Sequence, residues 1–182
     1  MSCNAYTLSA LLMDCARSKG GIKNVYLANF DDVVSAEPGT EGDKEKIATI
    51  TMKEGAKFKK FYFRPNTSSH SDTLTRDDAN GVNYVTSTVS LVFTRQDTTK
   101  RIAMTALCVN DLAVIVEDAN GFITYLTKDA PAVATEATGD TGTAAADGNK
   151  YTITLSADNE TWPYEVTAKA LASVIETDPA QK

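Results

Sequence analysis

The sequence of 182 residues is poor in the side chains from which catalytic and metal sites are usually built. It has one histidine, His70, and three cysteines, Cys3, Cys15 and Cys108. Imidazole and thiolate are frequent general bases, nucleophiles and zinc ligands, so their scarcity argues against most hydrolases, redox enzymes and structural metal sites. The composition therefore predicts that the protein is not an enzyme and that it carries no metal and no cofactor.

Long hydrophobic runs and an excess of positive charge are also missing. The longest apolar stretches span only a few residues, far below the roughly 20 that cross a bilayer, so no membrane contact is expected. The segment Met1–Arg17 has no basic region before its apolar patch and predicts no signal peptide. With 18 Lys and Arg against 24 Asp and Glu, the formal charge of −6 excludes a basic surface that coats nucleic acid.

The cysteines are expected to be reduced, because nothing in the sequence indicates an oxidising compartment. Cys108 lies in the apolar run Ile102–Val109 and is predicted to be a small buried hydrophobe. A disulfide between Cys3 and Cys15 remains an open alternative.

β-Branched and aromatic residues gather in short segments between turn residues, which predicts a mainly β protein with one domain over residues 1–182. Gly55 suggests a hairpin between two of these segments, and Asn120-Gly121 is a strong hairpin signal for another pair. The last two segments are expected to pair with each other. The predicted strands are 22–30, 47–52, 58–64, 82–95, 112–117, 122–127, 151–155 and 163–167.

The segment 82–95 has the clearest alternation. One face carries Val85, Val89, Leu91 and Phe93 and is predicted to be core, whereas the other face is rich in Thr and Ser. The segment 58–64 (FKKFYFR) alternates as well, and we expect an aromatic core face and a cationic outer face there rather than a site that stacks on single-stranded nucleic acid.

Two helices are expected. Asp97 can cap a main helix over 100–109, in which Ile102, Thr105, Ala106 and Val109 share one face. A short N-terminal helix is expected within Met1–Arg17, ending before Gly20-Gly21. Together these elements predict an α+β fold: an antiparallel β-sandwich or barrel with one main flanking helix and long polar assembly loops.

Three polar stretches contain too few apolar residues to build a core. Residues 35–46 predict an exposed loop, and residues 65–81 form a 17-residue polar run whose only large aliphatic residue is Leu74. Residues 129–149 consist mainly of Ala, Thr, Gly and Asp and predict a mobile loop or assembly arm. A structureless loop as long as 65–81 is unusual inside a compact domain, so contacts outside the monomer are expected to order that run. The tail from Asp178 (178–182) is expected to be frayed.

No short motif indicates catalysis. Ser68-Ser69-His70-Ser71-Asp72 places Ser, His and Asp close in sequence, but a catalytic triad is assembled by the fold, and an exposed loop histidine is the simpler interpretation. The acidic groups at 31–32, 77–78 and 140–147 lack the spacing of an EF-hand loop and suit solvated turns.

Several segments together resemble the major tail tube proteins of tailed bacteriophages that infect Bacteroides-type bacteria. The likeness is carried by Gly20-Gly21-Ile22-Lys23 with Val25–Asn29, by the run Lys100–Asn110, and by Val114–Gly121. It implies a virion structural protein that assembles with itself into hexameric rings, which stack into a tube for DNA ejection. It further implies location in the virion tail after synthesis in the host cytoplasm, with tape-measure, baseplate or hub, and terminator proteins as partners, and double-stranded DNA passing through without specific binding.

If this resemblance holds, the polar run 65–81 is the expected assembly contact with an adjacent subunit or ring, and the acidic balance is expected to give the channel a negative wall. The Thr/Ser face of 82–95 is a candidate either for that wall or for the interface within a ring, and the sequence does not choose between them. A β-sandwich binding module of carbohydrate or adhesin type, and another phage tail, ring or connector protein, remain alternatives. The candidate interface residues are Asn66, Thr67, Ser68, Ser69, His70, Ser71, Asp72, Leu74, Arg76, Tyr84, Thr86 and Thr88.

Overall fold

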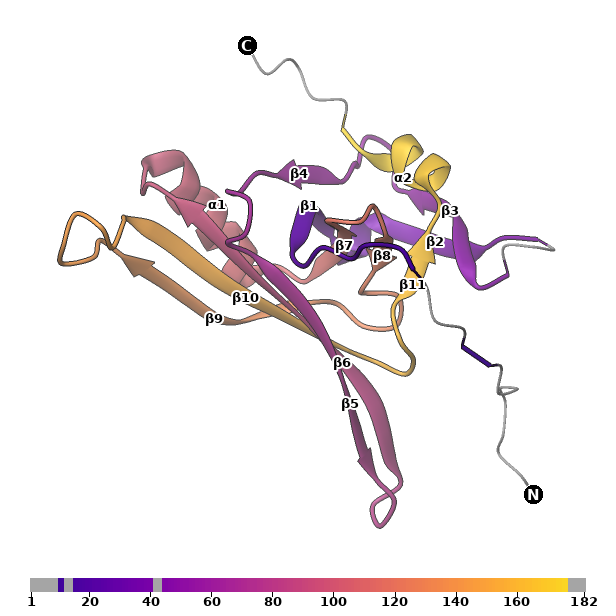
Figure 1. Ribbon diagram of the computed structural model, residues 1–182. Coiled ribbons are helices and arrows are strands. Elements are labelled where there is room, and N and C mark those ends of the chain that lie inside the picture. The colour runs from indigo at the N-terminus through magenta and orange to yellow at the C-terminus, as the bar shows by residue number, and fades with distance from the viewer. Residues whose placement is uncertain (1–9, 12–14, 41–43, 177–182) are drawn as a thin grey trace.

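The computed structural model describes residues 10–11, 15–40 and 44–176 (Figure 1). In chain order the elements are β1 (Ile22–Asn29), a 3-10 turn (Phe30–Asp32), β2 (Val33–Pro38), β3 (Lys46–Met52), β4 (Lys59–Phe61), β5 (Ser69–Asp77), β6 (Val82–Thr94), α1 (Thr98–Val109), β7 (Leu112–Asp118), β8 (Ile123–Tyr125), β9 (Val133–Asp140), β10 (Lys150–Asn159), β11 (Tyr164–Val166) and α2 (Ala168–Val174).

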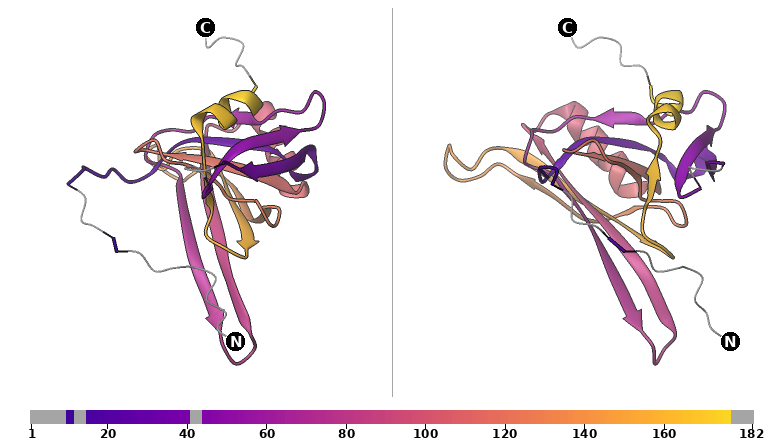
Figure 2. Two further views of the ribbon diagram at one scale, coloured as in Figure 1. Left: turned by 90° about the vertical axis from the view of Figure 1, so that its right-hand side faces the viewer. Right: turned by 45° about the vertical axis from the view of Figure 1, so that its right-hand side comes forward.

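The strands form two sheets, as the predicted α+β sandwich class requires. A seven-stranded sheet has the order β2-β3-β11-β8-β7-β1-β4, and a four-stranded sheet has the order β5-β6-β10-β9. All neighbouring strands are antiparallel except β3 and β11, which are parallel. The four-stranded sheet packs across the β1 and β7 region of the larger sheet, and α1 lies beside the space between them (Figures 1 and 2).

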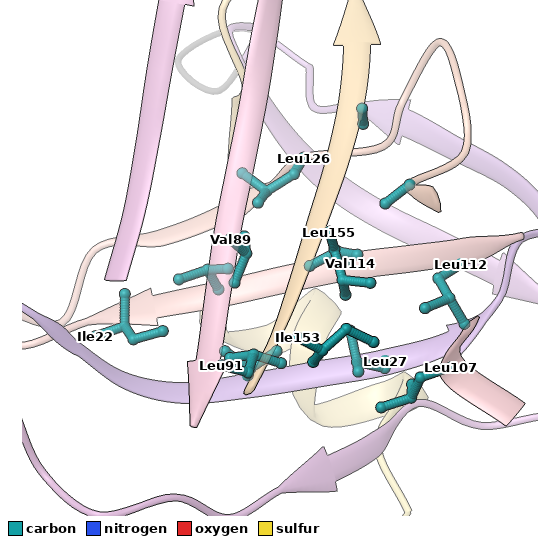
Figure 3. Packing of buried hydrophobic residues seen from close by; sticks show 14 of the residues in the cluster. Ile22, Leu27, Val89, Leu91, Leu107, Leu112, Val114, Leu126, Ile153 and Leu155 are labelled. Atoms are coloured by element: carbon teal, nitrogen blue, oxygen red, sulfur yellow. The ribbon is translucent and has the colours of Figure 1, made fainter. Parts of the chain in front are cut away.

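The main core lies between the two sheets. Val114 of β7 and Leu27 of β1 meet Leu91 of β6 and Ile153 of β10, and Leu107 of α1 closes one end (Figure 3). These side chains alternate along their strands with residues that face the other way, so each strand contributes every second residue to this core.

A second core lies on the opposite face of the seven-stranded sheet, under α2. Ile115 of β7 and Tyr26 of β1 pack there with Leu171 and Val174 of α2. The Thr167 side chain caps α2 by accepting a hydrogen bond from the Ala170 N–H at 3.2 Å. The central strand β7 is thus buried on both faces, which explains its continuous apolar sequence Leu-Ala-Val-Ile-Val.

The hairpin predicted at Asn120-Gly121 is confirmed, with β7 and β8 as its strands. One carboxylate oxygen of Asp118 accepts hydrogen bonds from the backbone N–H of Asn120 at 2.8 Å and of Phe122 at 2.7 Å. Gly121 has φ +88°, a conformation that glycine adopts without steric cost. These groups hold the pKa of Asp118 below its ordinary value even though partial burial acts to raise it.

The predicted helix after Asp97 is also confirmed, but its buried face is wrong. The Asp97 side chain accepts a hydrogen bond from the Lys100 N–H at 2.8 Å and begins α1. Met104 and Leu107 are the buried residues, whereas Ile102 and Val109 are 58% and 78% exposed. The helix carries two apolar stripes, and only the stripe that faces the sheets is covered.

The prediction that Cys108 is buried is wrong as well, because its thiol lies on the exposed side of the same helix. Cys3 lies outside the described residues, so the structure does not test the alternative of a disulfide between Cys3 and Cys15. Most of the expected N-terminal helix also falls outside them, and residues 10–11 and 15–20 are not helical. The expected frayed tail 178–182 lies outside the described residues.

Two predicted strand pairings are wrong. β3 pairs with β2 and β11 instead of the following β4, which pairs with β1. β10 and β11, expected as partners, belong to different sheets. Both predictions pair strands that follow one another in sequence, whereas the structure pairs β4 with β1 and β11 with β3 and β8. Residues 35–46, expected as a loop, also contain most of β2.

Candidate assembly surface

The polar run 65–81 is mainly a strand, and the expectation of a structureless loop is wrong. β5 pairs with β6 over its whole length, from Ser69 opposite Ser90 to Asp77 opposite Val82. We refer to residues 69–90 as the hairpin arm. The arm extends well beyond the body of the molecule (Figures 1 and 2). Thr and Ser have sufficient strand propensity to form such a ladder without contributing to the core.

A tight turn closes the tip of the hairpin arm. The Asp77 carboxylate accepts hydrogen bonds from the backbone N–H groups of Ala79 (3.0 Å) and Asn80 (3.3 Å), and from the Asn80 side chain at 2.6 Å. These hydrogen bonds lower the pKa of Asp77. Gly81 follows with φ +67°. The tip is therefore a defined turn built by its own side chains.

The candidate interface residues at the start of the run form a bend. Asn66 has φ +61°, Thr67 donates a hydrogen bond from its hydroxyl to the Arg64 carbonyl at 2.6 Å, and Ser68 is buried. The Ser68 hydroxyl accepts a hydrogen bond from the Val92 N–H at 3.1 Å. These three residues orient the arm on β6, and Ser68 is too buried to contact another molecule directly.

His70 and Asp72 lie on the face of β5 that turns toward the core. His70 Nε2 is 3.0 Å from Asp72 Oδ1, and the same oxygen accepts a hydrogen bond from the Ser87 hydroxyl at 2.6 Å. In a nucleophilic triad the imidazole stands between the hydroxyl and the carboxylate so that it can take the proton. Here the carboxylate stands in the middle, so the geometry ties β5 to β6 and does not activate Ser87.

The opposite face of the four-stranded sheet is lined with hydroxyl groups, and we refer to it as the hydroxyl face. Register and alternation place there the predicted Tyr84, Thr86 and Thr88. The Thr86 hydroxyl donates a hydrogen bond to Asp158 at 2.7 Å. The other members are Ser69, Ser71, Thr73, Thr75, Ser90, Val92, Thr94, Glu136, Thr138, Asp140, Lys150, Thr152, Thr154, Ser156 and Asp158.

The charges of the hydroxyl face are mostly negative. The face carries three carboxylates, on Glu136, Asp140 and Asp158, and one ammonium group, on Lys150. Lys150 lies opposite Asp140 in the register of β9 and β10. No group of three or more His, Cys, Asp or Glu residues that could hold a metal ion exists in the part of the chain that the structure describes. The face is therefore a hydroxyl-rich surface of weakly acidic character.

Both edges of the four-stranded sheet are open within the described ranges. β5 has only β6 as a strand neighbour and β9 has only β10. The interval 129–149, expected as a mobile loop or assembly arm, contains β9, so the loop expectation is wrong for residues 133–140. An open edge presents unpaired N–H and C=O groups that can pair with a strand of another molecule.

A groove of about 500 Å³ lies where the hairpin arm extends past the end of β10, at the base of its projecting part, and no sequence pattern indicated it. Leu74 and Val85 of the arm line it together with Trp162 and Tyr164 from the region between β10 and β11. Leu74, a predicted interface residue, is 49% exposed and Trp162 is 57% exposed. The predicted Arg76 also lines the groove, and it forms an exposed ion pair with Asp78 at 2.7 Å.

The sequence matches no known protein family and no curated protein. Among solved structures, the chain is similar to a chain in the virion of a native gene transfer agent particle, with 11% identity over 76% of this chain and 98% of the other. The TM-score of this pair is 0.34. A likeness of this degree supports no argument about function. In the described residues, no helix has the length and apolar character needed to span a membrane.

Proposed function

We propose that the protein is a virion structural protein that assembles with itself into rings, hexameric as in the tail tube proteins it resembles, and that the rings stack into a tube for DNA ejection. The observation that carries the proposal is the four-stranded sheet, with a hydroxyl face and two open edges. Among the residues that the structure describes, one face of this sheet is covered by no other element and neither edge has a further strand neighbour.

The strand directions of this sheet are compatible with a closed ring. The sheet has four antiparallel strands, so β5 and β9 at its two edges run in opposite directions. Rotation about a ring axis would bring β5 of one copy beside β9 of the next, and the antiparallel alternation would continue. This contact joins two different surfaces, and such heterologous contacts generate rings when the rotation closes.

In the proposed tube the hydroxyl face lines the channel. Duplex DNA carries one negative charge per about 1.7 Å of its axis, so clustered Lys and Arg would hold it and slow its passage. Hydroxyl groups with a small excess of carboxylates repel the phosphates weakly, and Lys150, which lies opposite Asp140, forms no cluster of cations with the other members of the face. The partners implied by the resemblance, tape-measure, baseplate or hub and terminator proteins, belong to this proposal.

The proposal includes the absence of a catalytic role. The arrangement of Ser87, Asp72 and His70 supports it, since the carboxylate separates the hydroxyl from the imidazole.

A carbohydrate-binding module is a second candidate, favoured by one observation. Trp162 is exposed at a groove whose rim includes Asn83 and Glu160. Aromatic faces beside hydrogen-bonding side chains are the usual elements of a sugar site.

Negative-stain microscopy of the purified protein tests the proposed function. Rings or tubes with a central channel support it. Particles that remain monomers across the accessible concentration range and bind immobilised glycans would contradict it and favour the binding module. A matched variant, Trp162→Ala, separates the two because it is expected to abolish glycan retention and to leave the edge contacts between β5 and β9 in place.

A further inference from the structure

The groove at the base of the hairpin arm exposes apolar side chains that come from two separate parts of the chain. Leu74 on the arm is 49% exposed and Trp162 beyond β10 is 57% exposed, and both line the same groove with Tyr164 and Pro163. Exposed apolar side chains that gather at one groove, unlike single scattered ones, are candidates for a contact surface.

The charged groups that line this groove do not favour an anionic occupant. Arg76 is engaged by the carboxylate of Asp78 through two hydrogen bonds, at 2.7 and 3.2 Å. Glu45 and Glu160 also line the groove, so the charge that remains after the Arg76–Asp78 pair is negative. The apolar part of the lining, Leu74, Trp162 and Tyr164, therefore suits an apolar segment that carries no negative charge.

The N-terminal part of the sequence contains such a segment. Residues 8–13 read Leu-Ser-Ala-Leu-Leu-Met and carry no charge. Leu11 is 98% exposed, so among the described residues it packs neither against the body nor in its own groove.

The point at which this segment leaves the body is fixed. The backbone N–H of Lys19 donates a hydrogen bond to Asn120 Oδ1 at 2.8 Å, and Asn120 Nδ2 donates one back to the Lys19 carbonyl at 3.0 Å. Leu11 precedes this anchor by eight residues, which allows a span of at most about 26–29 Å for an extended chain. That length is enough for Leu11 to reach a molecule in contact with its own.

We propose that the apolar segment 8–13 of one copy occupies the groove formed by Leu74 and Trp162 of a second copy. The inference deepens the proposed self-assembly and rests on it for the identity of the partner. The exchange buries the two exposed apolar surfaces against each other, and it links neighbouring copies by a contact that is independent of the β5 and β9 edges.

A cysteine cross-link between two differently labelled copies tests this contact. In a full-length background with Cys3, Cys15 and Cys108 changed to Ser, one chain carries Leu11→Cys and a second, tagged chain carries Leu74→Cys. The two are mixed, allowed to assemble and oxidised. The matched control replaces the second chain with Val34→Cys, which is on β2, is 62% exposed and does not line the groove. Thermal unfolding of each variant verifies that it is folded.

The expected result is a disulfide-linked heterodimer with the Leu74→Cys partner and its loss with the Val34→Cys partner. Equal cross-linking to both partners, or none to Leu74→Cys, would overturn the inference. A further variant carries both Leu11→Cys and Leu74→Cys in one chain. If this variant forms an intramolecular disulfide and the mixture gives no heterodimer, segment 8–13 occupies the groove of its own chain, and the inference is overturned. If no cross-link forms and the protein binds glycans, the groove would be assigned to a sugar, which would also overturn the inference.

The outcome is separable from that of the proposed function. Tubes that form without the heterodimer would overturn the segment exchange and leave the tube standing. A heterodimer without rings or tubes would support the exchange and count against the tube.

Discussion

The two sheets of this protein differ in how much of their surface the chain itself covers. The seven-stranded sheet is covered on one face by the four-stranded sheet and α1, and on the other by α2, so β7 is buried on both sides. The four-stranded sheet has one buried face, one hydroxyl face and two open edges. The first sheet is covered by its own chain, whereas the second presents a polar face and two edges that, in the proposed assembly, other copies cover.

The largest expected effect comes from the doubly buried strand. Ile115 is fully buried in the core under α2. Ile115→Ala removes buried methylene groups and leaves a cavity, which is expected to lower the free energy of unfolding by about 2–5 kcal/mol. Urea denaturation measures this loss. Thr88→Ala shortens a side chain on the hydroxyl face and is the control. If it lowered the free energy of unfolding as much as Ile115→Ala, the proposed difference between the two sheets would be wrong.

A buried hydroxyl in the same region is expected to have the next largest effect. Thr127 is fully buried, and its hydroxyl accepts a hydrogen bond from the Val114 N–H at 2.9 Å. Thr127→Val keeps the shape but leaves that N–H without an acceptor, which is expected to cost about 1–3 kcal/mol. Thermal unfolding measures it, with Thr127→Ser as the control that retains the acceptor. Equal stability of the Val and Ser variants would contradict the assignment.

An ion pair at the margin of the seven-stranded sheet predicts a smaller, pH-dependent effect. Lys23 and Asn24 each donate a hydrogen bond to Glu117 at 2.6 Å. Burial acts to raise the pKa of Glu117, but these hydrogen bonds and the Lys23 charge outweigh it and hold the pKa below its ordinary value.

A lowered folded-state pKa contributes stability that is fully present above the unfolded pKa, near 4.3, and is lost as the pH falls through the folded value. Glu117→Gln is therefore expected to lower the melting temperature slightly at pH 7, with a difference from wild type that vanishes at acidic pH. Melting curves from pH 7 to pH 3 measure it. A difference that grows on acidification would have the wrong sign.

A proline on the open edge of β9 is expected to have the smallest effect on the stability of the monomer, although it is expected to abolish assembly. Successive backbone N–H groups of a strand point to opposite sides, so of Ala137→Pro and Thr138→Pro one removes a bond to β10 and the other removes only a group on the open edge. The variant that removes only an open-edge N–H group is expected to keep its melting temperature and lose ring formation. Rings formed by both variants would show that the β9 edge is not an interface.

The sequence was sufficient where the determinants are local. Asn120-Gly121 set the β7–β8 hairpin and Asp97 set the start of α1, since each acts through neighbouring backbone groups. The alternation of Val85, Val89, Leu91 and Phe93 correctly placed the core face of β6. The aromatic core face of 58–64 was also correct, since Phe61 and Phe63 pack against the main core.

The sequence was insufficient where the determinants are distant. β5 and β9 are rich in Thr and Ser and carry little apolar residue content, so their strand character depends on β6 and β10 as partners. The groove joins Leu74 with Trp162, which are far apart in sequence, and neither residue predicts the other. Residues 133–138 read Val-Ala-Thr-Glu-Ala-Thr without regular alternation, and the register of β9 with β10 shifts at this point, so no period-two pattern marked the strand.

Cryo-electron microscopy of the assembled protein tests the central claim most directly, because it shows which sheet encloses the channel. The account predicts rings in which β5 of one copy pairs with β9 of the next and the hydroxyl face, with Thr86, Thr88 and Thr154, lines the lumen. A channel lined by the seven-stranded sheet, or rings whose β5 and β9 edges remain unpaired, would contradict it.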